Sequence, residues 1–375
     1  MRLQSIDMLR GLVIVWMVLD HTRDFFTRVR FEPTDLAHTT PALFMTRFIT
    51  HFCAPVFIML AGTSAYLASA RLSRPQLARF LLTRGLWLIV VEFTLVNFAW
   101  NFNFAYKLGL IMQVIWAIGA SMCVLAGLVF LPLPLIAALS LLLIGLHNLL
   151  DPIHASALGD WASLWRVLHE QGPITTGLVL YPLVPWIGVM AGGFALGPLF
   201  SLPAPQRRRA LLAMGAAACL LFVVLRAPNL YGDPAPWSVQ RDATFSLLSF
   251  LNVTKYPPSL LYLLVTLGPA LLALAWFEGM QGRVVALLAT FGRVPLFAYV
   301  VHLTLVHALA GLFGFASGFG SAILRNLFVF YPTGYGTGLA GVYTAYAIVL
   351  LLLYPACRWF AGVKRRHSAA WLAYL

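Results

Sequence analysis

The first long apolar run of the chain, LRGLVIVWMVLDHTRDFF (9–26), contains ionisable side chains near both ends, among them Arg10, Asp20, His21 and Asp24. An ionisable group at bilayer depth is costly unless it is paired or faces water, so each one is a hypothesis for a functional site. In a helix, Arg10 and His21 lie within ~20° of the same face and ~16 Å apart along it, whereas Asp20 points ~100° away from His21. The run therefore predicts a polar stripe with an arginine at one end and a histidine at the other.

The second apolar run, TRFITHFCAPVFIMLAGTSAYL (46–67), repeats this pattern. Arg47 and His51 form an i,i+4 pair on one helical face, and we expect His51 at an outer depth comparable with that of His21. Neutral imidazole is a good general base, and a carboxylate neighbour such as Asp20 orients it and raises its basicity. Together, the two runs predict a proton-transfer site in the outer half of the membrane.

Other polar residues in the apolar runs are weaker candidates. For each of them alone we favour a structural hydrogen bond to a neighbouring helix, and near the ends of the runs we expect arginines to extend to the membrane surface. No complete set of metal ligands accompanies His21 and His51, so we predict no metal site. The further candidates are Glu92, Asn97, Gln113, His147, Asn148, Asp151, His302 and His307, and the arginines near run ends are Arg84, Arg226 and Arg293.

The composition predicts the class of protein whose helices must position these side chains. The 375 residues are 61% hydrophobic and 10% charged, with a mean hydropathy of +0.86. Soluble domains have a charged fraction near a quarter, so these values predict an all-α, polytopic integral membrane protein, embedded in the lipid bilayer as a single domain (1–375). Apolar runs of spanning length predict about ten transmembrane helices: 8–27, 43–70, 80–103, 108–131, 134–150, 177–200, 210–227, 257–279, 290–314 and 338–361.

The charge pattern predicts the orientation of these helices. The net charge is +13, but the basic residues are scattered through loops and run ends without the basic stripe of a nucleic-acid-binding protein. Alternate loops are enriched in arginine, and with both termini in the cytoplasm these loops satisfy the positive-inside rule. The predicted cytoplasmic segments carry Arg71, Arg74, Arg79, Arg207, Arg208, Arg209, Arg283, Lys364, Arg365 and Arg366.

Two predicted outer loops are longer than a simple connection requires. They cover 151–175 and 226–259 and contain aromatic, proline and charged residues. Long segments outside the spans of a compact protein are more often functional than idle, although most of their residues fit ordinary surface loops.

Motifs of soluble enzymes are missing from the sequence. There is no Walker loop, no GxGxxG after a strand, no HExxH and no GxSxG. A proton-coupled small-molecule transporter is the alternative interpretation, because proton relays use the same buried residue types. Transporters commonly show inverted repeats with paired broken helices, and this sequence has no such internal symmetry.

Several segments, in their order along the chain, resemble a known family. RLQSIDMLRGLVIVWMVLDHTRDFF, THFCAPVFIMLAGTSAYL, YPLVPWIGVMAGG, SFLNVTKYPPSLLYLLVTLGPALL and FGRVPLFAYVVHL are similar to bacterial members of the heparan-α-glucosaminide N-acetyltransferase catalytic-domain family. The R-x10-H spacing of Arg10 and His21 also resembles the membrane acyltransferase-3 family, which acylates cell-surface sugars. Both families are grouped as transmembrane acyltransferases.

The resemblance implies an enzyme of the cell inner (plasma) membrane with about ten helices. It implies an acyl-coenzyme A donor, in the first place acetyl-CoA, from the cytoplasm and a carbohydrate or glycolipid acceptor outside. The first-span histidine would be the general base or a transient acyl carrier. In lysosomal members the position matched to Asp20 carries an amide and the catalytic histidine lies further along the outer loop. This leaves His21, His38 and His51 as alternatives.

Our hypothesis takes His21 as the base, because the R-x10-H spacing is kept without a gap, and Asp20 as the residue that orients it. Arg10, at the cytoplasmic edge, is expected to bind phosphate or pantetheine of the donor. Arg47 or Arg293 would stabilise the oxyanion or bind donor phosphates. His51 and His302 complete the predicted substrate-binding residues. Whether the chain forms a homo-oligomer is left open.

Overall fold

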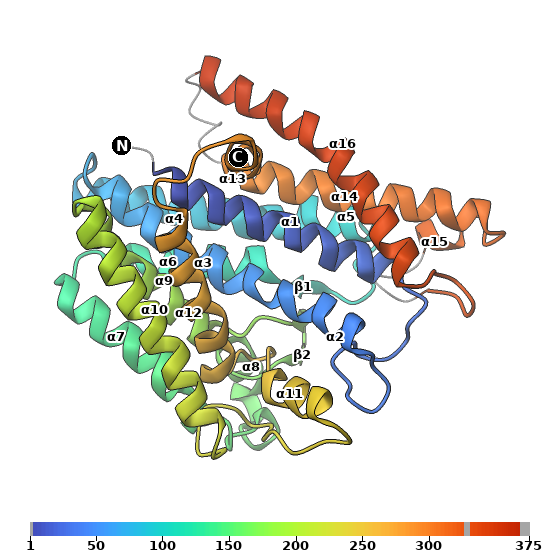
Figure 1. Cartoon of the computed structure of the whole chain (residues 1–375), viewed down its shortest axis with the longest axis horizontal. Helices are drawn as coiled ribbons and strands as arrows, with labels where there is room; N and C mark the ends of the chain where they lie inside the picture. Colours follow the sequence, from blue (N-terminus) through green and yellow to red (C-terminus); the bar gives the residue numbers. More distant parts are fainter. Residues whose placement is uncertain (1–2, 326–330, 368–375) are drawn as a thin grey trace. The chain divides into compact units, whose positions relative to one another are not determined.

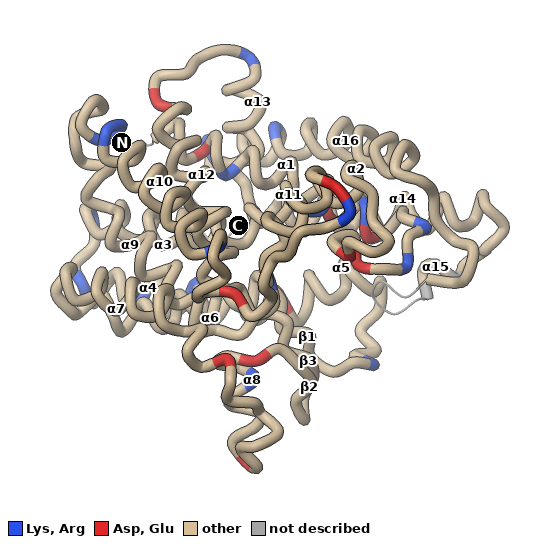
Figure 2. The backbone as a smooth tube through the Cα atoms, turned by 60° about the horizontal axis from the view of Figure 1, so that its bottom comes forward, with Lys and Arg blue, Asp and Glu red and all other residues tan. Residues whose placement is uncertain are grey.

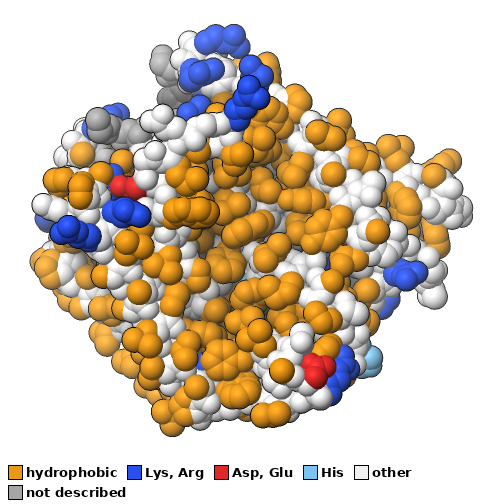
Figure 3. All heavy atoms as spheres, viewed as in Figure 1, with side chains coloured by type: hydrophobic (Ala, Val, Ile, Leu, Met, Phe, Trp, Pro, Cys, Tyr) orange, Lys and Arg blue, Asp and Glu red, His pale blue; other side chains and the backbone are white. Residues whose placement is uncertain are grey.

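The computed structural model describes residues 3–325 and 331–367 and is built almost entirely from helices (Figure 1). Within these residues, eight helical segments are long and apolar enough to cross a membrane. Hydrophobic side chains cover most of the face shown in Figure 3. The prediction of an all-α polytopic membrane protein is therefore confirmed. The eight segments are Pro41–Ser69, Arg74–Asn101, Leu133–Leu150, Leu183–Ser201, Ala204–Arg226, Leu260–Phe277, Pro295–Ala316 and Leu339–Arg366.

The other two predicted spans are also helices. The first is α1 (Gln4–Phe26), which has 23 residues and carries the ionisable groups noted above. The second is α6 (Val114–Leu128), which has 15 residues and is shorter than a usual span. All ten predicted runs thus contain helices, although not all reach spanning length. The cytoplasmic location of both termini remains a prediction.

Two predicted spans begin too early, because their first residues form a small sheet. β1 (Leu110–Met112), β2 (Gly172–Ile174) and β3 (Gly177–Val179) pair in the order β1-β3-β2, with β1 and β3 parallel and β2 and β3 antiparallel. A side chain at Gly177 would collide with the backbone of Leu110. Close strand pairing therefore replaces helix at these positions, and α9 (Leu183–Ala195) begins only after Pro182.

A third predicted span, 290–314, is divided between two helices. α13 (Arg283–Gly292) ends before Arg293, and α14 (Pro295–Ala316) begins with Pro295 in its first turn. Proline is tolerated in the first turn of a helix, but in the interior its ring clashes with the preceding turn, so Pro295 starts a new helix.

The chain forms two compact units. The first contains Met1–Cys53, Thr94–Lys107 and Gly279–Leu375. In it, α1 packs against α13, α14 and α16 (Leu339–Arg366), as Figure 1 shows. The unit also contains α2 (Pro41–Phe48), a 3₁₀ turn (Ile49–Phe52), α5 (Asn97–Asn101) and α15 (Ala322–Arg325).

Glycines permit the closest approach in the first unit. A side chain at Gly11 of α1 would collide with the carbonyl of Leu288 in α13, and one at Gly292 of α13 would collide with the carbonyl of Asp7 in α1. Small residues let membrane helices pack with their backbones close together. This packing fixes α1 along the helix that ends beside Arg293.

The second unit contains Ala54–Phe93 and Leu108–Glu278. Its helix pairs are α4 with α6, α6 with α9, α7 with α9 and α10 with α12. Its helices are the rest of α3 (Cys53–Ser69), α4 (Arg74–Val91), α6, α7 (Leu133–Leu146), α8 (Ala162–Leu168), α9, α10 (Ala204–Arg226), α11 (Ala243–Leu251) and α12 (Leu260–Phe277). Short 3₁₀ turns lie at His147–Leu150, Ala155–Ala157, Gly159–Trp161 and Gly197–Ser201, and a π-helical turn follows α4 at Glu92–Val96.

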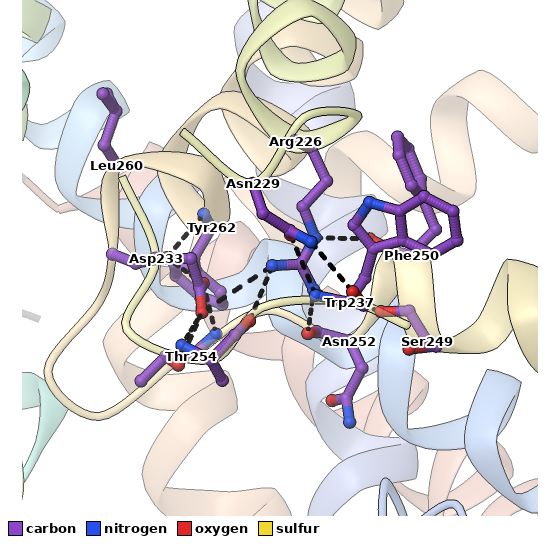
Figure 4. A network of polar contacts seen from close by, with 12 residues as sticks. Arg226, Asn229, Asp233, Trp237, Ser249, Phe250, Asn252, Thr254, Leu260 and Tyr262 are labelled. Carbon is purple, nitrogen blue, oxygen red and sulfur yellow. Dashed lines mark hydrogen bonds and ion pairs between the residues drawn. The ribbon is translucent and has the colours of Figure 1, made fainter. Parts of the chain in front are cut away.

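Arg226, which we expected to extend to the membrane surface, is instead buried with 1% of its surface exposed. Its guanidinium donates to the carbonyls of Ser249 (3.1 Å), Phe250 (3.1 Å) and Asn252 (2.8 Å), which end α11 (Figure 4). A cation at a helix C-terminus satisfies carbonyls that have no partner within the helix. Arg226 therefore orders the 226–259 loop, and this role explains its position at the end of α10.

Charged residues are sparse in both units and lie mainly in loops and near helix ends (Figure 2). This distribution agrees with helices that face lipid over most of their length. The polar residues inside the helices are therefore the exceptions on which a candidate site can be built.

Candidate functional site

The candidate site is built on His21 of α1 and His302 of α14, which lie 281 residues apart in sequence. His21 Nδ1 and His302 Nε2 are 2.7 Å apart, and the two rings are nearly parallel, with an interplanar angle of 10°. Both residues lie in the first unit. The structure thus brings together two of the predicted site residues.

The hydrogen bonds assign the tautomers of this pair. His302 Nδ1 lies 2.7 Å from the carbonyl oxygen of Ala298, which can only accept, so Nδ1 carries the proton. Neutral His302 then presents a lone pair on Nε2, and His21 donates to it through Nδ1–H. When His21 is neutral, its lone pair is therefore on Nε2, the nitrogen required for a general base.

Burial differs between the two rings. His302 is fully buried, whereas His21 is half-buried. His21 also packs against Trp100 of α5 and Tyr299 of α14, with ring centroids 5.0 and 5.9 Å away. His302 and the two aromatic rings therefore hold His21 in one orientation, and part of the surface of the His21 side chain stays accessible.

Asp20 is bound by partners from the second apolar run. Arg47 Nη1 donates to both carboxylate oxygens at 3.1 Å, and Thr50 Oγ1 donates to Oδ1 at 2.9 Å. Arg23 Nη2 lies 2.8 Å from Asp20 Oδ1 and 2.6 Å from Asp24 Oδ1. These contacts fasten α1 to α2 and the turn after it. The role of Asp20 in orienting His21 stays a prediction.

The predicted helical face shared by Arg47 and His51 is interrupted. Residues Ile49–Phe52 form a 3₁₀ turn, in which each residue advances ~120° instead of ~100°. His51 is therefore rotated away from Arg47 and is buried, with its ring 5.8 Å from that of Phe48. The i,i+4 spacing did not reveal this change because apolar patterns do not distinguish the two helix types.

Arg10 lies at the opposite end of α1 from His21, as predicted. Its Nη1 is 3.5 Å from Asp7 Oδ1 and 3.4 Å from the carbonyl oxygen of Gly292. Arg293 Nε is 3.9 Å from the other oxygen of Asp7. Two guanidiniums thus share one buried carboxylate, which leaves a local excess of positive charge about 16 Å along the helix from His21.

His38, the alternative base, lies in the loop before α2. Its Nδ1 is 2.7 Å from Asp35 Oδ2, and 65% of its side chain is exposed. The hydrogen bond to His38 lowers the pKa of Asp35 below its usual range. His38 therefore has an orienting carboxylate, whereas His21 has a buried histidine.

Other predicted polar residues have structural partners. In the first unit, His307 Nδ1 donates to the carbonyl of Ala99 (3.0 Å), and its ring stacks on Phe102. In the second unit, Glu92 Oε2 accepts from the backbone N–H of Trp116 (2.8 Å) in the first turn of α6. The carboxylate satisfies a donor that the helix leaves without an internal partner, so Glu92 caps α6.

A second polar cluster lies at the end of α7. Asp151 accepts from Asn148 Nδ2 (2.8 Å) and His169 Nε2 (3.0 Å). Burial alone would raise the pKa of Asp151, but the hydrogen bonds from His169 and Asn148 hold it below its usual range. Asn148 Oδ1 also accepts from the Leu260 backbone, and His147 Nε2 contacts the Pro258 carbonyl at 2.8 Å. The cluster joins the end of α7 to the 151–175 loop and the start of α12.

Sequence reasoning missed the aromatic and acidic neighbours of the site. Trp100, Tyr299 and Asp7 were not predicted because an aromatic or single acid near a run end is common in membrane helices. Arg23, three residues after Asp20 on α1, could have been predicted from its i,i+3 spacing. Among residues 3–325 and 331–367, no group of three His, Cys, Asp or Glu side chains could hold a metal ion.

The fold and site define a polytopic helical membrane protein with a histidine pair, of which one ring is buried and the other half-buried. Residues 2–227 match the profile of the family described as heparan-alpha-glucosaminide N-acetyltransferase, catalytic, and the chain belongs to this family. No curated protein matches the chain. The match includes α1 and His21, whereas His302 and Arg293 lie beyond its end.

Proposed function

We propose that the protein transfers an acyl group, in the first place acetyl, from cytoplasmic acyl-coenzyme A to an acceptor on the outer side of the inner membrane. Its family supports transmembrane acetyltransferase-type activity. The hydrogen bond between His21 Nδ1 and His302 Nε2 carries the proposal, because it makes Nε2 of His21 a proton acceptor on a half-buried ring.

In the proposed reaction, His21 Nε2 removes the proton from an acceptor hydroxyl or amine. The acceptor atom attacks the thioester carbonyl, and a tetrahedral intermediate with a negative oxygen forms. Collapse of this intermediate breaks the carbon–sulfur bond, and the proton held by His21 passes to the leaving thiolate of coenzyme A. General base catalysis of this kind contributes typically ~10²–10⁴-fold to the rate.

The opposite end of α1 supports a role in donor binding. Arg10 and Arg293 share the single carboxylate of Asp7. Guanidinium groups bind phosphate with bidentate geometry, so these two arginines suit the phosphates of coenzyme A. Arg293 is assigned to the donor for this reason. Arg47, which is paired with Asp20, holds α2 in place beside α1.

A sugar is the proposed acceptor class. The family description contains a glucosaminide, so an amino sugar is the first acceptor to test. Asp20, which precedes His21, belongs to one group of ion pairs with Arg23, Asp24 and Arg47, and the formal charges of this group sum to zero. Paired carboxylates and guanidiniums offer both acceptors and donors, which suits a ligand with several hydroxyl groups.

The test measures release of coenzyme A by the protein reconstituted in liposomes with acetyl-CoA and glucosamine. We expect His21→Gln to lower kcat at least 10²-fold, because the general base is lost. His38→Gln and His51→Gln are matched controls, and we expect both to keep activity within about threefold of wild type.

Two outcomes would contradict the proposal. Full turnover by His21→Gln, with loss of activity in His38→Gln or His51→Gln, would move the base to that histidine. If the wild-type protein released no coenzyme A with any amino sugar yet took up a solute against a proton gradient, the transporter interpretation would replace acyl transfer.

A further inference from the structure

The C-terminal half of α1 has one accessible face. From 17 to 26, which the structure describes in full, only Asp20, His21 and Asp24 keep accessible surface, and the other side chains are buried. In a helix, Asp20 and Asp24 lie within ~40° of each other, and both lie within ~100° of His21. The three residues span ~6 Å of the helix axis. Two carboxylates and the half-buried ring of His21 thus form a polar row about as long as one monosaccharide ring.

Asp24 is the more available of the two carboxylates. Arg47 donates to both oxygens of Asp20, and Thr50 donates to one of them, so that 14% of the Asp20 side chain is exposed. Asp24 accepts through Oδ1 from Arg23 Nη2 (2.6 Å), and 30% of its side chain is exposed. Within the described part of the chain, Asp24 Oδ2 has no hydrogen-bond partner. This oxygen can therefore accept from a ligand.

Arg23 has an unused donor beside this carboxylate. Its side chain is 4% exposed, and its Nη2 contacts Oδ1 of both Asp20 and Asp24. The other terminal nitrogen of the same planar group, Nη1, is buried and has no hydrogen-bond partner among residues 3–325 and 331–367. A buried N–H without an acceptor is costly, so an oxygen atom of a ligand would stabilise this end of α1.

The two available groups favour a hydroxyl as the ligand group. Asp24 Oδ2 requires a donor and Arg23 Nη1 requires an acceptor, and a hydroxyl is both. An ammonium group can only donate. An ionised phosphate can only accept, and the carboxylates of Asp20 and Asp24 repel it. Asp24 lies ~4.5 Å along the helix axis from His21, so one sugar ring can reach both residues.

We propose that Asp24 is a specificity-determining residue that binds the acceptor sugar. Asp24 Oδ2 accepts from a ring hydroxyl of the sugar, and Arg23 Nη1 donates to the oxygen of that hydroxyl. The amine or hydroxyl that is acylated then lies at His21 Nε2. This role rests on the proposed function, since it requires the acceptor at His21. It assigns to Asp24 the recognition of the sugar and leaves proton transfer to His21.

Binding of glucosamine to the purified full chain, measured by calorimetry without acyl-CoA, tests this role. The comparison ligands are monodeoxy analogues of glucosamine, each of which lacks one hydroxyl. We expect the wild-type protein to bind one analogue about tenfold more weakly than glucosamine, because a hydrogen bond to a charged group is lost. This comparison does not depend on the folding of any variant.

Asp24→Asn identifies the residue that reads this hydroxyl. Arg23 keeps its ion pair with Asp20 in this variant, so we expect it to fold. It should bind glucosamine about tenfold more weakly than wild type and should bind the discriminated analogue as well as it binds glucosamine. Glu32→Gln removes an exposed acid of the same unit outside α1 and is the matched control, with a change below about twofold.

Release of coenzyme A in liposomes distinguishes failure of this role from failure of the proposed function. We expect Asp24→Asn to raise KM for glucosamine about tenfold and to change kcat less than about threefold. Equal binding of all the sugars by wild type, or wild-type discrimination by Asp24→Asn, would overturn the role of Asp24 even if acetyl transfer proceeds. The expected binding pattern without release of coenzyme A would support the sugar site and contradict only the acyl transfer.

Discussion

His21 forms a hydrogen bond with a second histidine, His302. His302 is anchored by the Ala298 carbonyl and accepts the Nδ1 proton of His21, so the pair has a defined orientation without an added charge. A pair of neutral rings adds no buried charge, and buried charge is costly inside a membrane domain. The histidine pair therefore fixes the direction of the lone pair on His21 Nε2 without adding a buried charge.

Part of this arrangement was predictable from residue spacing. Arg10 and His21 lie on one helix because the whole of Gln4–Phe26 is helical, so the period of the helix predicts their relation. His302 was a candidate only as an isolated polar residue. Its contact with His21 joins positions 281 residues apart, and no local pattern encodes such a pairing.

We expect His302→Leu to lower kcat at least tenfold with little change in KM, because His21 would lose the partner that fixes its tautomer. His302→Gln should recover part of this loss, since its side-chain oxygen can accept from His21 Nδ1. The kinetic assay with acetyl-CoA and glucosamine, repeated from pH 5 to 9, measures both effects.

The pH profile separates positioning from simple structural support. A base must be neutral to accept a proton, so activity falls at low pH, and we expect the pH of half-maximal activity to change in His302→Leu and to stay close to wild type in His302→Gln. A loss of activity with an unshifted midpoint in both variants would contradict the positioning role of His302.

At the scale of the elements, hydropathy predicts where helices occur but not how they begin or bend. The ten apolar runs all contain helices, yet β1 and β3 replace the first residues of two runs. The 3₁₀ turn Ile49–Phe52 and the π-helical turn Glu92–Val96 were also missed. These features depend on which backbone groups pair, and similar apolar residues occur in all of them.

The close contact between α1 and α13 leads to a prediction about the free energy of unfolding. We expect Gly11→Ala to destabilise the protein by about 1–3 kcal/mol, because the new methyl group collides with the Leu288 carbonyl. Gly127→Ala, near the end of α6, is the matched control, since a Cβ there meets no atom within 4 Å. Unfolding in a denaturing detergent series measures both, and equal stability of the two variants would contradict the close packing of α1 on α13.

Arg226 supplies a second prediction at this scale. We expect Arg226→Gln to destabilise the protein by about 3–5 kcal/mol, because the change removes a buried cation from the C-terminal carbonyls of α11 and from Asp233. Arg208→Gln, an exposed arginine on the same helix, should be neutral. Thermal unfolding and protease cleavage within 226–259 measure the effect. If the Arg226→Gln variant unfolded at the wild-type temperature and resisted cleavage, this role of Arg226 would be disproved.

At the scale of the whole molecule, two chemically different groups occur along one helix. Arg10 with Arg293 lies at the end of α1 predicted to be cytoplasmic, and His21 with His302 lies toward the predicted outer end. The family supports acetyl transfer, and the predicted orientation places donor and acceptor on opposite sides. Acyl transfer across the membrane is therefore the central claim.

Sealed inverted membrane vesicles, whose cytoplasmic face points outward, test this claim most directly. Acetyl-CoA is supplied outside, and glucosamine is enclosed within. We predict that N-acetylglucosamine accumulates inside vesicles containing the wild-type protein and at least 10²-fold more slowly with His21→Gln. Product that forms only when donor and acceptor are on the same side, or at an unchanged rate with His21→Gln, would contradict the account.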